Sequence, residues 1–400
     1  KQRQDSVGAN ARRTIKFLDE FRENGSLSTG VKVHKGKSNK IFVYSFQEVR
    51  ETFPTDFNEK IPDHQIIATA NHLSKVYPTC KVSLISRDIN MRVSADSIGL
   101  PCGDYNPDNI VKEGSEIYTG FSEILVDDEL IDRFYSDELI YTDSLDIKEI
   151  LNPNQFIMLI SSQNQNKTAL CRYREKNFPL RKVIKQKNSH GLVPRNKEQS
   201  FAFDLLFDIN TPLVTLVGSA GTGKTLCALS AGLEQVVGQE SHYTRLIVSR
   251  PVQPMGKDIG FLPGTMEEKM APWLTPIQDN LQFLLGNDKI MLQEYLDRGT
   301  IEIEALTFIR GRSISNAFII IDEAQNLTKH ELKTIITRVG EGSKIILTGD
   351  IQQIDNAYIT ETSNGLVHAV ESFKKSDLAG HISFVKGERS TLATMAAKIL

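Results

Sequence analysis

Short unbroken runs of apolar residues dominate the second half of the chain, with longer mixed segments between them. The runs predict buried β-strands at residues 213–217, 245–249, 301–305, 317–321, 344–348 and 382–385. The segments between the runs predict helices, so strand and helix alternate regularly from about residue 196 onward. Such an alternation is typical of an α/β fold on a parallel sheet, and it defines a predicted domain over residues 191–400.

The first third of the chain also alternates, but with shorter elements. Apolar residues at helical spacing predict an amphipathic helix over residues 6–24, and a second helix begins where Pro62 is followed by Asp63. Short strands are predicted at residues 31–34, 41–45 and 81–86, and a further helix at residues 91–96. The pattern predicts a small α/β domain over residues 1–112.

Residues 113–190 follow a third pattern, which predicts a small β-rich middle domain. An acidic stretch from Glu123 to Glu138, interpreted as a solvated face and loop, precedes predicted strands at residues 156–161 and 168–173. A basic segment follows, with Tyr173 and Phe178 interleaved. Its cations are Arg172, Arg174, Lys176, Arg181, Lys182, Lys185, Lys187 and Arg195. It is the best candidate for a nucleic-acid contact by phosphate pairing and base stacking, with an exposed basic linker as the alternative.

The strand at residues 213–217 leads into a segment that fits the pattern G-x-x-x-x-G-K-[ST]. Glycines let such a loop turn its backbone N–H groups toward a phosphate, Lys224 reaches the β and γ oxygens, and Thr225 offers its hydroxyl to Mg2+. The following helix directs its N-terminal dipole at the same anion. The candidate nucleotide ligands are Gly218, Ser219, Ala220, Gly221, Thr222, Gly223, Lys224 and Thr225. The sequence therefore predicts binding of ATP with magnesium.

A second polar feature follows the strand at residues 317–321, which leads into Asp322 and Glu323. Two adjacent carboxylates at the end of a buried strand are costly unless a cation lies beside them. Asp322 is the expected partner of Mg2+, and Glu323 is expected to orient or deprotonate the attacking water. With the phosphate loop, the pair predicts a P-loop NTPase core.

Further residues complete the candidate site. Gln199 lies upstream of the phosphate-loop strand, where a side-chain amide can pair with the edge of adenine. Thr348, Asp350 or Gln353, in and after the strand at residues 344–348, could sense the γ-phosphate. The arginines that could neutralise the transferred phosphoryl charge are Arg250, Arg310, Arg312 and Arg389.

Composition narrows the class of protein. The 400 residues are 40% hydrophobic and 24% charged with a formal net charge of −3, so any contact with nucleic acid must come from local patches. The four cysteines are scattered without a C-x-x-C pair, which argues against a zinc site or a disulfide framework and favours a reducing compartment. No stretch is apolar enough for a membrane span. We expect a cytoplasmic protein of two or three domains.

Residues 190–400 resemble the ATPase domain of the PhoH family. The segments that carry the resemblance are Pro194–Gln199, the phosphate loop, Arg250–Gly256, Ile259–Gly264, Arg310–Ser313, Asp322–Asn326 and Thr348–Asp350. The resemblance implies a RecA-like core similar to that of superfamily 1 helicases, in which Arg389 lies where those helicases place a nucleotide-contacting arginine. Because the chain has one such core, a neighbouring subunit would supply the arginine finger, and a homo-oligomeric, hexameric ring is expected.

The first domain resembles the PIN nuclease domain that is fused to PhoH in one branch of that family. The match lies in Pro62–Ile66 and Ser86–Arg92. PIN-type hydrolysis needs carboxylates that converge on Mg2+ or Mn2+, and the candidates are Asp63, Asp88 and Asp96, with a helix N-cap as the alternative for Asp63. The resemblance also predicts that the first strand of the PIN domain, with its aspartate, precedes residue 1, so the nuclease site is expected to be incomplete.

The resemblance implies an ATP-dependent motor that unwinds RNA and is joined to a metal-dependent ribonuclease. The motor is expected to move along single-stranded RNA and to deliver it to the ribonuclease for cleavage. One alternative is a nucleotide-gated RNA-binding or regulatory assembly, in which ATP controls oligomerisation and no unwinding occurs. Another is a small-molecule kinase, which is disfavoured because kinases must exclude the water that Glu323 is placed to activate.

Overall fold

The computed structural model describes most of the chain, in two compact units, Lys1–Pro107 and Asp108–Leu400. The described residues are 6–33, 39–45, 47, 49–50, 53–55, 57–86, 88–103, 110–111, 116–145, 147, 150–184, 190–239, 241–251, 266–306, 313–356 and 359–385, with side chains from residue 14 and, in the helix that begins at Met266, from Trp273. The predicted boundary near residue 190 lies inside the second unit and stays a prediction.

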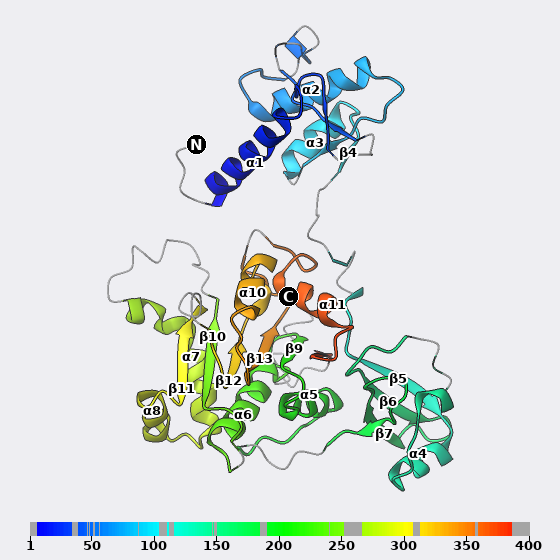
Figure 1. Ribbon diagram of the computed structural model, residues 1–400, viewed down its shortest axis with the longest axis vertical. Coiled ribbons are helices and arrows are strands. Elements are labelled where there is room, and N and C mark those ends of the chain that lie inside the picture. Colours follow the sequence, from blue (N-terminus) through cyan, green and yellow to red (C-terminus); the bar gives the residue numbers. More distant parts are fainter. Residues whose placement is uncertain are drawn as a thin grey trace. The chain divides into compact units, whose positions relative to one another are not determined.

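The described part of the first unit contains three α-helices and two small sheets (Figure 1). The helices are α1 (Ser6–Arg22), α2 (Pro62–Val76) and α3 (Ile89–Ser97). Strands β1 (Val31–Lys32) and β2 (Lys40–Ile41) pair antiparallel, and β3 (Leu84–Ile85) and β4 (Cys102–Gly103) pair in parallel. The core of this unit includes Ile67, Leu84, Met91, Ala95 and Leu100. The predicted α/β character of residues 1–112 is confirmed, although the strands are shorter than predicted.

The second unit is built around a six-stranded sheet in which every neighbouring pair is parallel. Its strands are β9 (Leu213–Gly218), β10 (Arg245–Arg250), β11 (Ile301–Ala305), β12 (Ala317–Ile321), β13 (Lys344–Gly349) and β14 (Ala379–Phe384), in the order β11-β10-β12-β13-β9-β14. All six lie where the apolar runs predicted strands, and β14 begins earlier than predicted. The predicted parallel α/β core is therefore confirmed.

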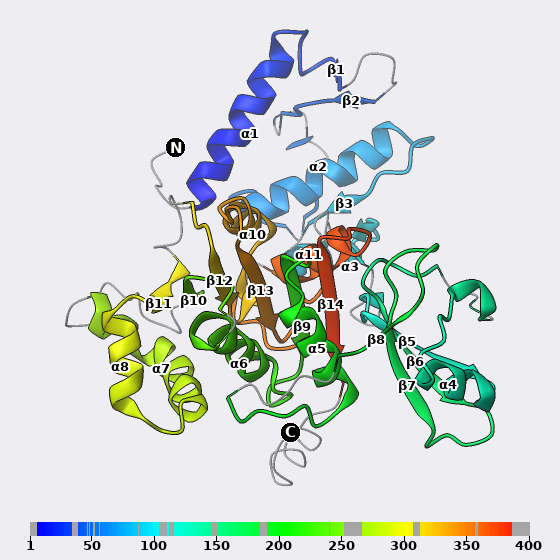
Figure 2. The ribbon, with the colours of Figure 1, turned by 60° about the horizontal axis from the view of Figure 1, so that its bottom comes forward.

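Helices cover both faces of this sheet (Figure 2). One face carries α5 (Lys197–Phe207), α6 (Lys224–Val237), α7 (Met266–Leu284) and α8 (Lys289–Asp297), and the other carries α10 (Lys329–Ile336) and α11 (Gly365–Phe373). Successive strand residues point to opposite faces, so Phe318 and Ile320 pack with the first group of helices. Ile319 and Ile321 pack with the second group. This double burial explains why the strands are unbroken apolar runs.

A smaller, four-stranded sheet belongs to the same unit. Its strands are β5 (Phe121–Val126), β6 (Phe156–Ser161), β7 (Thr168–Arg172) and β8 (Arg181–Lys182), in that order, and helix α4 (Asp128–Tyr135) packs on it. Strands β6 and β7 confirm the predicted ones. The sequence predicted a solvated face and loop for the acidic stretch. Most of its acidic side chains are exposed, as predicted, but the expected loop was wrong, because β5 and α4 lie there and Ile124, Ile131 and Phe134 pack into the core.

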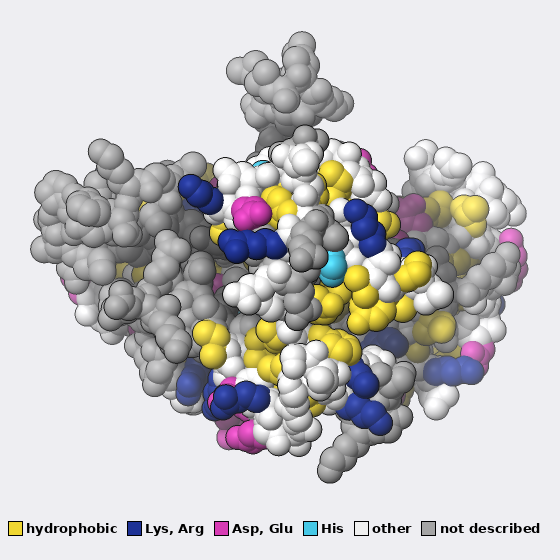
Figure 3. All heavy atoms as spheres, turned by 90° about the horizontal axis from the view of Figure 1, so that it is seen from above, with side chains coloured by type: hydrophobic (Ala, Val, Ile, Leu, Met, Phe, Trp, Pro, Cys, Tyr) yellow, Lys and Arg dark blue, Asp and Glu magenta, His cyan; other side chains and the backbone are white. Residues whose placement is uncertain are grey.

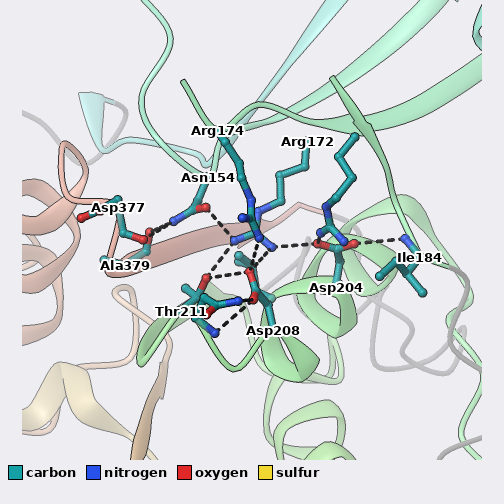
Figure 4. Close-up of polar contacts among 12 residues, drawn as sticks. Asn154, Arg172, Arg174, Ile184, Asp204, Asp208, Thr211, Asp377 and Ala379 are labelled. Atoms are coloured by element: carbon teal, nitrogen blue, oxygen red, sulfur yellow. Dashed lines mark hydrogen bonds and ion pairs between the residues drawn. The ribbon is translucent and has the colours of Figure 1, made fainter. Parts of the chain in front are cut away.

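A buried network of charges joins the small sheet to the large one (Figure 4). Arg172, the last residue of β7, is fully buried. Its guanidinium donates to Asp204 at 2.9 Å, to Asn154 at 2.7 Å and to Thr211 at 2.8 Å. It also forms an ion pair with Asp208 at 2.9 Å. Because Asp204 and Asp208 come from α5 and its C-terminal cap, this network fastens α5 to the small sheet.

Lys344 adds a second buried cation at the start of β13. Its ammonium donates to the backbone carbonyls of Leu205, Asp208 and Thr211 at 2.7, 2.8 and 2.8 Å. Burial lowers the pKa of Lys344 to about 7, and the Asp208 carboxylate opposes that change. A neutral amine has only two N–H groups, so the three acceptors favour the charged form. The carbonyls that end α5 thus gain donors that water cannot supply.

Candidate active site

The phosphate loop connects β9 to α6, and its shape depends on glycine. Gly221 and Gly223 have φ angles of 79° and 91°, in the left-handed region that favours glycine. Gly223 is also the N-cap residue of α6, and a Cβ atom there would lie 3.0 Å from Nε2 of Gln199. The loop therefore brings its N–H groups and the N-terminus of α6 to one place, as anion binding requires.

The first two residues of α6 supply the polar side chains of the loop. Lys224 Nζ donates to the carbonyls of Gly218 and Ser219 at 2.6 and 2.9 Å. Thr225 Oγ1 donates to Oδ1 of Asp322 at 2.8 Å, although the two residues are 97 positions apart. This contact brings together the two motifs that the sequence predicted to share a nucleotide and its metal ion.

Strand β13 lies between β9 and β12, so the residues at its C-terminal end reach both motifs. Thr348 Oγ1 donates to Oδ1 of Asp322 at 2.6 Å. Asp350 Oδ2 accepts from the backbone N–H of Ala220, in the phosphate loop, at 2.9 Å. Two of the three predicted γ-phosphate sensors, Thr348 and Asp350, thus contact Asp322 or the phosphate loop directly. The third, Gln353, lines the cavity beside the phosphate loop.

A cavity of about 250 Å3 lies between these groups. That is many times the ~10–15 Å3 that one enclosed water molecule needs, which leaves room for phosphate groups. Its lining residues are Ala220, Gly221, Gly223, Lys224, Thr225, Leu226, Asn280, Asp322, Glu323, Gly349, Asp350 and Gln353. Asn280, from α7, is a polar lining residue that no motif in the sequence indicates.

The oxygens around Asp322 fit a magnesium ion. Mg2+ prefers hydroxyl and carboxylate oxygens and keeps several waters, so the Thr225 hydroxyl and the Asp322 carboxylate are sufficient protein ligands beside a cavity. When bound there, Mg2+ would neutralise phosphate charge and orient the terminal phosphate. Both residues therefore stay the predicted ligands of the ion.

Glu323 follows Asp322 in a strained conformation. Its φ angle of 55° is left-handed, which is costly for a residue with a side chain. Its Oε1 forms an ion pair with Arg250 at 3.3 Å, and its Oε2 accepts from Nε2 of Gln325 at 2.5 Å. Burial, together with the adjacent Asp322 carboxylate, raises the pKa of Glu323 above its ordinary value. A raised pKa suits a group that takes a proton from water.

Gln199 lies beside the phosphate loop. Its Nε2 donates to the carbonyl of Thr222 at 3.1 Å, and its Oε1 accepts from the N–H of Arg195 at 2.8 Å. The side chain therefore supports the loop, and its pairing with adenine stays a prediction.

Of the four predicted arginine fingers, only Arg250 lies among the described residues. Arg250 pairs with Glu323, so it acts on the carboxylate within its own chain. Arg310, Arg312 and Arg389 lie outside the described residues.

The cations of the basic segment differ in their surroundings. Arg172 is fully buried, Arg181 forms an ion pair with Asp204, and Lys182 pairs with Asp137. Lys182 also lies 5.6 Å from the ring centroid of Phe134. The prediction was wrong for Arg172, because its side chain is fully buried, and it stays a prediction for Arg181 and Lys182, which are ion-paired but partly exposed.

What stays exposed is the hairpin loop between β7 and β8. It presents Arg174, Lys176 and Phe178, while Arg195 is exposed elsewhere, and Lys185 and Lys187 lie outside the described residues. On the face drawn in Figure 3, the described Lys and Arg side chains stand singly or in small groups among hydrophobic and polar ones. That face carries no continuous basic stripe among the described residues.

The three PIN candidates occupy exposed positions in the first unit. Asp88 is the N-cap of α3, and its carboxylate accepts from the N–H groups of Asn90 and Met91 at 2.8 and 3.3 Å. Asp63 lies in the first turn of α2, whose N-cap is Ile61, and Asp96 lies in the last turn of α3. Across the described parts of the chain, no three His, Cys, Asp or Glu side chains form a group that could hold a metal ion. Asp63, Asp88 and Asp96 stay predicted ligands of the nuclease metal ion.

Comparison with protein families agrees with this arrangement. Residues 191–399 match the model of PhoH-like proteins, and residues 1–106 match a PIN domain model. The chain belongs to the PhoH family. It is a PhoH-type P-loop ATPase with a PIN domain ahead of it, and both kinds of domain generally use a divalent metal.

Several relatives in the PhoH family align with nearly the whole of this chain. Protein PhoH2 of Bacillus subtilis is 42% identical over 409 residues, which cover 99% of this chain and 90% of that protein. Protein PhoH2 of Mycolicibacterium smegmatis is 33% identical, with 100% and 88% covered. Among solved structures, the Pif1 helicase from Candida albicans is 14% identical over 48% of this chain and 40% of that one, with a TM-score of 0.24. A TM-score this low does not show a shared fold. The fold of this chain is instead established by the order of the strands in its parallel sheet.

None of the described helices has the length and apolar character of a membrane span.

Proposed function

We propose that this chain is an ATP-hydrolysing motor that moves along single-stranded RNA and separates RNA strands, acting in the cytoplasm as a homo-oligomeric, hexameric ring. The observation that carries the proposal is the contact between Thr225 and Asp322 beside Glu323, across a cavity lined by the phosphate loop. A site that places a carboxylate base beside bound phosphate favours transfer to water over transfer to a second substrate.

Each residue of the site has a distinct part in hydrolysis. The loop N–H groups and Lys224 bind the phosphate oxygens, and Thr225 with Asp322 would hold the magnesium ion. Glu323 accepts a proton from the attacking water, and the neighbouring Arg250 keeps its carboxylate oriented. Because Arg250 is engaged by Glu323, an arginine from a neighbouring subunit would neutralise the transferred charge, and Arg310, Arg312 and Arg389 stay the candidates.

The hairpin loop between β7 and β8 is our candidate RNA contact. Lys176 is exposed, and the Phe178 side chain is 52% exposed, next to the half-exposed Arg174. Exposed aromatic rings stack with bases of any sequence, while cations pair with the phosphates. A large aromatic side chain on such a loop suits a partner that presents unpaired bases.

Phosphate release measured with and without single-stranded RNA tests this assignment. We expect RNA to stimulate hydrolysis, and the double variant Lys176→Glu, Phe178→Ala to need about tenfold more RNA for half-maximal stimulation, because one stacked base contributes about 1–3 kcal/mol. The rate without RNA should not change, since both side chains lie outside the cavity.

The matched control carries the same two changes on a different surface. Lys289→Glu with Phe283→Ala alters an exposed lysine of α8 and a 58% exposed phenylalanine of α7. Its RNA response should equal that of the wild type. If RNA leaves the wild-type rate unchanged and no duplex is separated, the motor is rejected in favour of a nucleotide-gated regulatory assembly.

The PIN domain adds a second proposal, a metal-dependent ribonuclease, which rests on the family match alone. Substitutions of Asp88 distinguish two roles of its carboxylate, that of a helix N-cap and that of a metal ligand. Asp88→Ala should lower the stability of the first unit by about 1 kcal/mol, while Asp88→Asn should keep it, because asparagine is an equally good N-cap.

Cleavage of RNA with Mg2+ or Mn2+ present is the second measurement on these variants. If Asp88 binds the ion, Asp88→Asn loses cleavage although its stability is kept. Cleavage by Asp88→Asn at the wild-type rate would leave Asp88 as a helix cap only.

A further inference from the structure

Gln325 is a fully buried side chain in the short turn Ala324–Asn326 that follows Glu323. Its Nε2 donates to Oε2 of Glu323 at 2.5 Å and to the backbone carbonyl of Gln353 at 2.8 Å. Its Oε1 accepts from the backbone N–H of Asp350 at 3.1 Å. One carboxamide thus joins the hydrolytic carboxylate to both ends of the segment 350–353 that leaves β13.

Asp350 extends this connection to the phosphate loop. Its carboxylate accepts from the N–H of Ala220 at 2.9 Å, while its own N–H donates to Gln325. A continuous series of hydrogen bonds therefore runs from the phosphate loop through Asp350 and Gln325 to Glu323. Such networks in a buried site act as a unit, so the position of each member depends on the others.

The surroundings leave room for this carboxamide and hold the strained residue beside it. A Cβ atom on Gly349 would lie 2.4 Å from Oε1 of Gln325, so glycine at this position keeps the space open. The left-handed φ of Glu323 persists only where neighbouring groups maintain it. Its two carboxylate oxygens are held by Arg250 and Gln325.

We propose that Gln325 is a positioning residue for hydrolysis, which keeps the Glu323 carboxylate and the segment 350–353 in one arrangement. Glu323 is then oriented toward the attacking water only while the segment beside the phosphate loop is in place. The inference rests on the proposed ATPase activity. Gln325 would then influence the rate of hydrolysis although its side chain does not line the nucleotide cavity.

Two substitutions test the proposal. Gln325→Met keeps the size of the side chain and removes its polar atoms, and Gln325→Glu keeps the shape but replaces the donor by a carboxylate. For both we expect kcat for ATP to be about 10- to 100-fold lower, as for the loss of a hydrogen bond to a charged group. KM for ATP should change by less than about twofold, because the phosphate-binding groups are unaltered.

The comparison of kcat with KM separates positioning from simple structural support. Loss of positioning lowers kcat while KM for ATP is kept, because ATP still binds to the phosphate loop. Loss of structural support alone would lower the melting temperature and leave kcat of the folded protein unchanged.

Gln235→Glu is the matched control, because Gln235 is also buried and donates to backbone carbonyls, of Leu206 and Ala231, at the far end of α6 from the phosphate loop. It should lower the melting temperature without lowering kcat. If the Gln325 variants only lose stability and keep the wild-type kcat, the proposal is overturned. A wild-type protein that hydrolyses no ATP would instead overturn the proposed function, and this inference with it.

Discussion

Glu323→Gln should lower the rate of ATP hydrolysis by about two to four orders of magnitude, the range that a positioned general base contributes. Glutamine keeps the size of the side chain and can still face Arg250, but it cannot take a proton from water. Lys224 and the phosphate loop are unaltered, so ATP should bind as in the wild type. Single-turnover phosphate release measures the first effect, and titration with a fluorescent ATP analogue measures the second.

Strand separation should disappear together with hydrolysis. Glu323→Gln should bind a tailed RNA duplex but fail to unwind it, whereas Glu294→Gln, an exposed glutamate on α8, should behave as the wild type. Unwinding by the Glu323→Gln variant would reject the assignment of ATP hydrolysis to RNA movement. Hydrolysis at the wild-type rate would reject Glu323 as the base.

Arg172→Met should destabilise the second unit by about 3–5 kcal/mol, the usual loss when one member of a buried ion pair is removed. Methionine fills much of the volume, but it leaves Asp204 and Asp208 without their shared cation inside the protein. Arg181 also pairs with Asp204, so we expect the lower part of this range. Trp273, the single tryptophan of the chain, lies in α7, and its fluorescence during urea denaturation reports this unit.

The comparison variant is Arg133→Met, which removes an ion pair with Glu138 whose side chains are half exposed. Solvent screens such a pair, so the denaturation midpoint should not change measurably. If Arg172→Met unfolds at the wild-type urea concentration, the network in Figure 4 does not hold the small sheet to α5.

The sequence predicted all six strands of the large sheet because that sheet is buried on both faces. Its strands are apolar at nearly every position, and a continuous apolar run such as 317–321 is visible without any knowledge of its partners. The same reasoning failed for β5, where Leu125 is exposed and Ser122 and Glu123 interrupt the apolar residues. A strand covered on one face only resembles a polar loop in composition.

The sequence also predicted the residues of the candidate site, since the glycines of the phosphate loop and the adjacent Asp322 and Glu323 are local patterns with a local physical meaning. Thr348 and Asp350 were candidates from the sequence as well, but only the tertiary structure decided which groups they contact. The insertion of β13 between β9 and β12 brings Thr348 and Asp350 to the site, and nothing within either motif encodes that order. Pairing between distant strands depends on the packing of the whole sheet.

Charge was the property that the sequence described least well. Arg172 and Arg174 are similar members of one basic segment, yet Arg172 is fully buried among carboxylates and Arg174 is exposed. The environment of a charged side chain depends on partners that other segments bring to it, as Asp204 and Asp208 do here. The linear pattern therefore determined the α/β core and its phosphate-binding chemistry, whereas only the folded chain decided which cations hold the protein together.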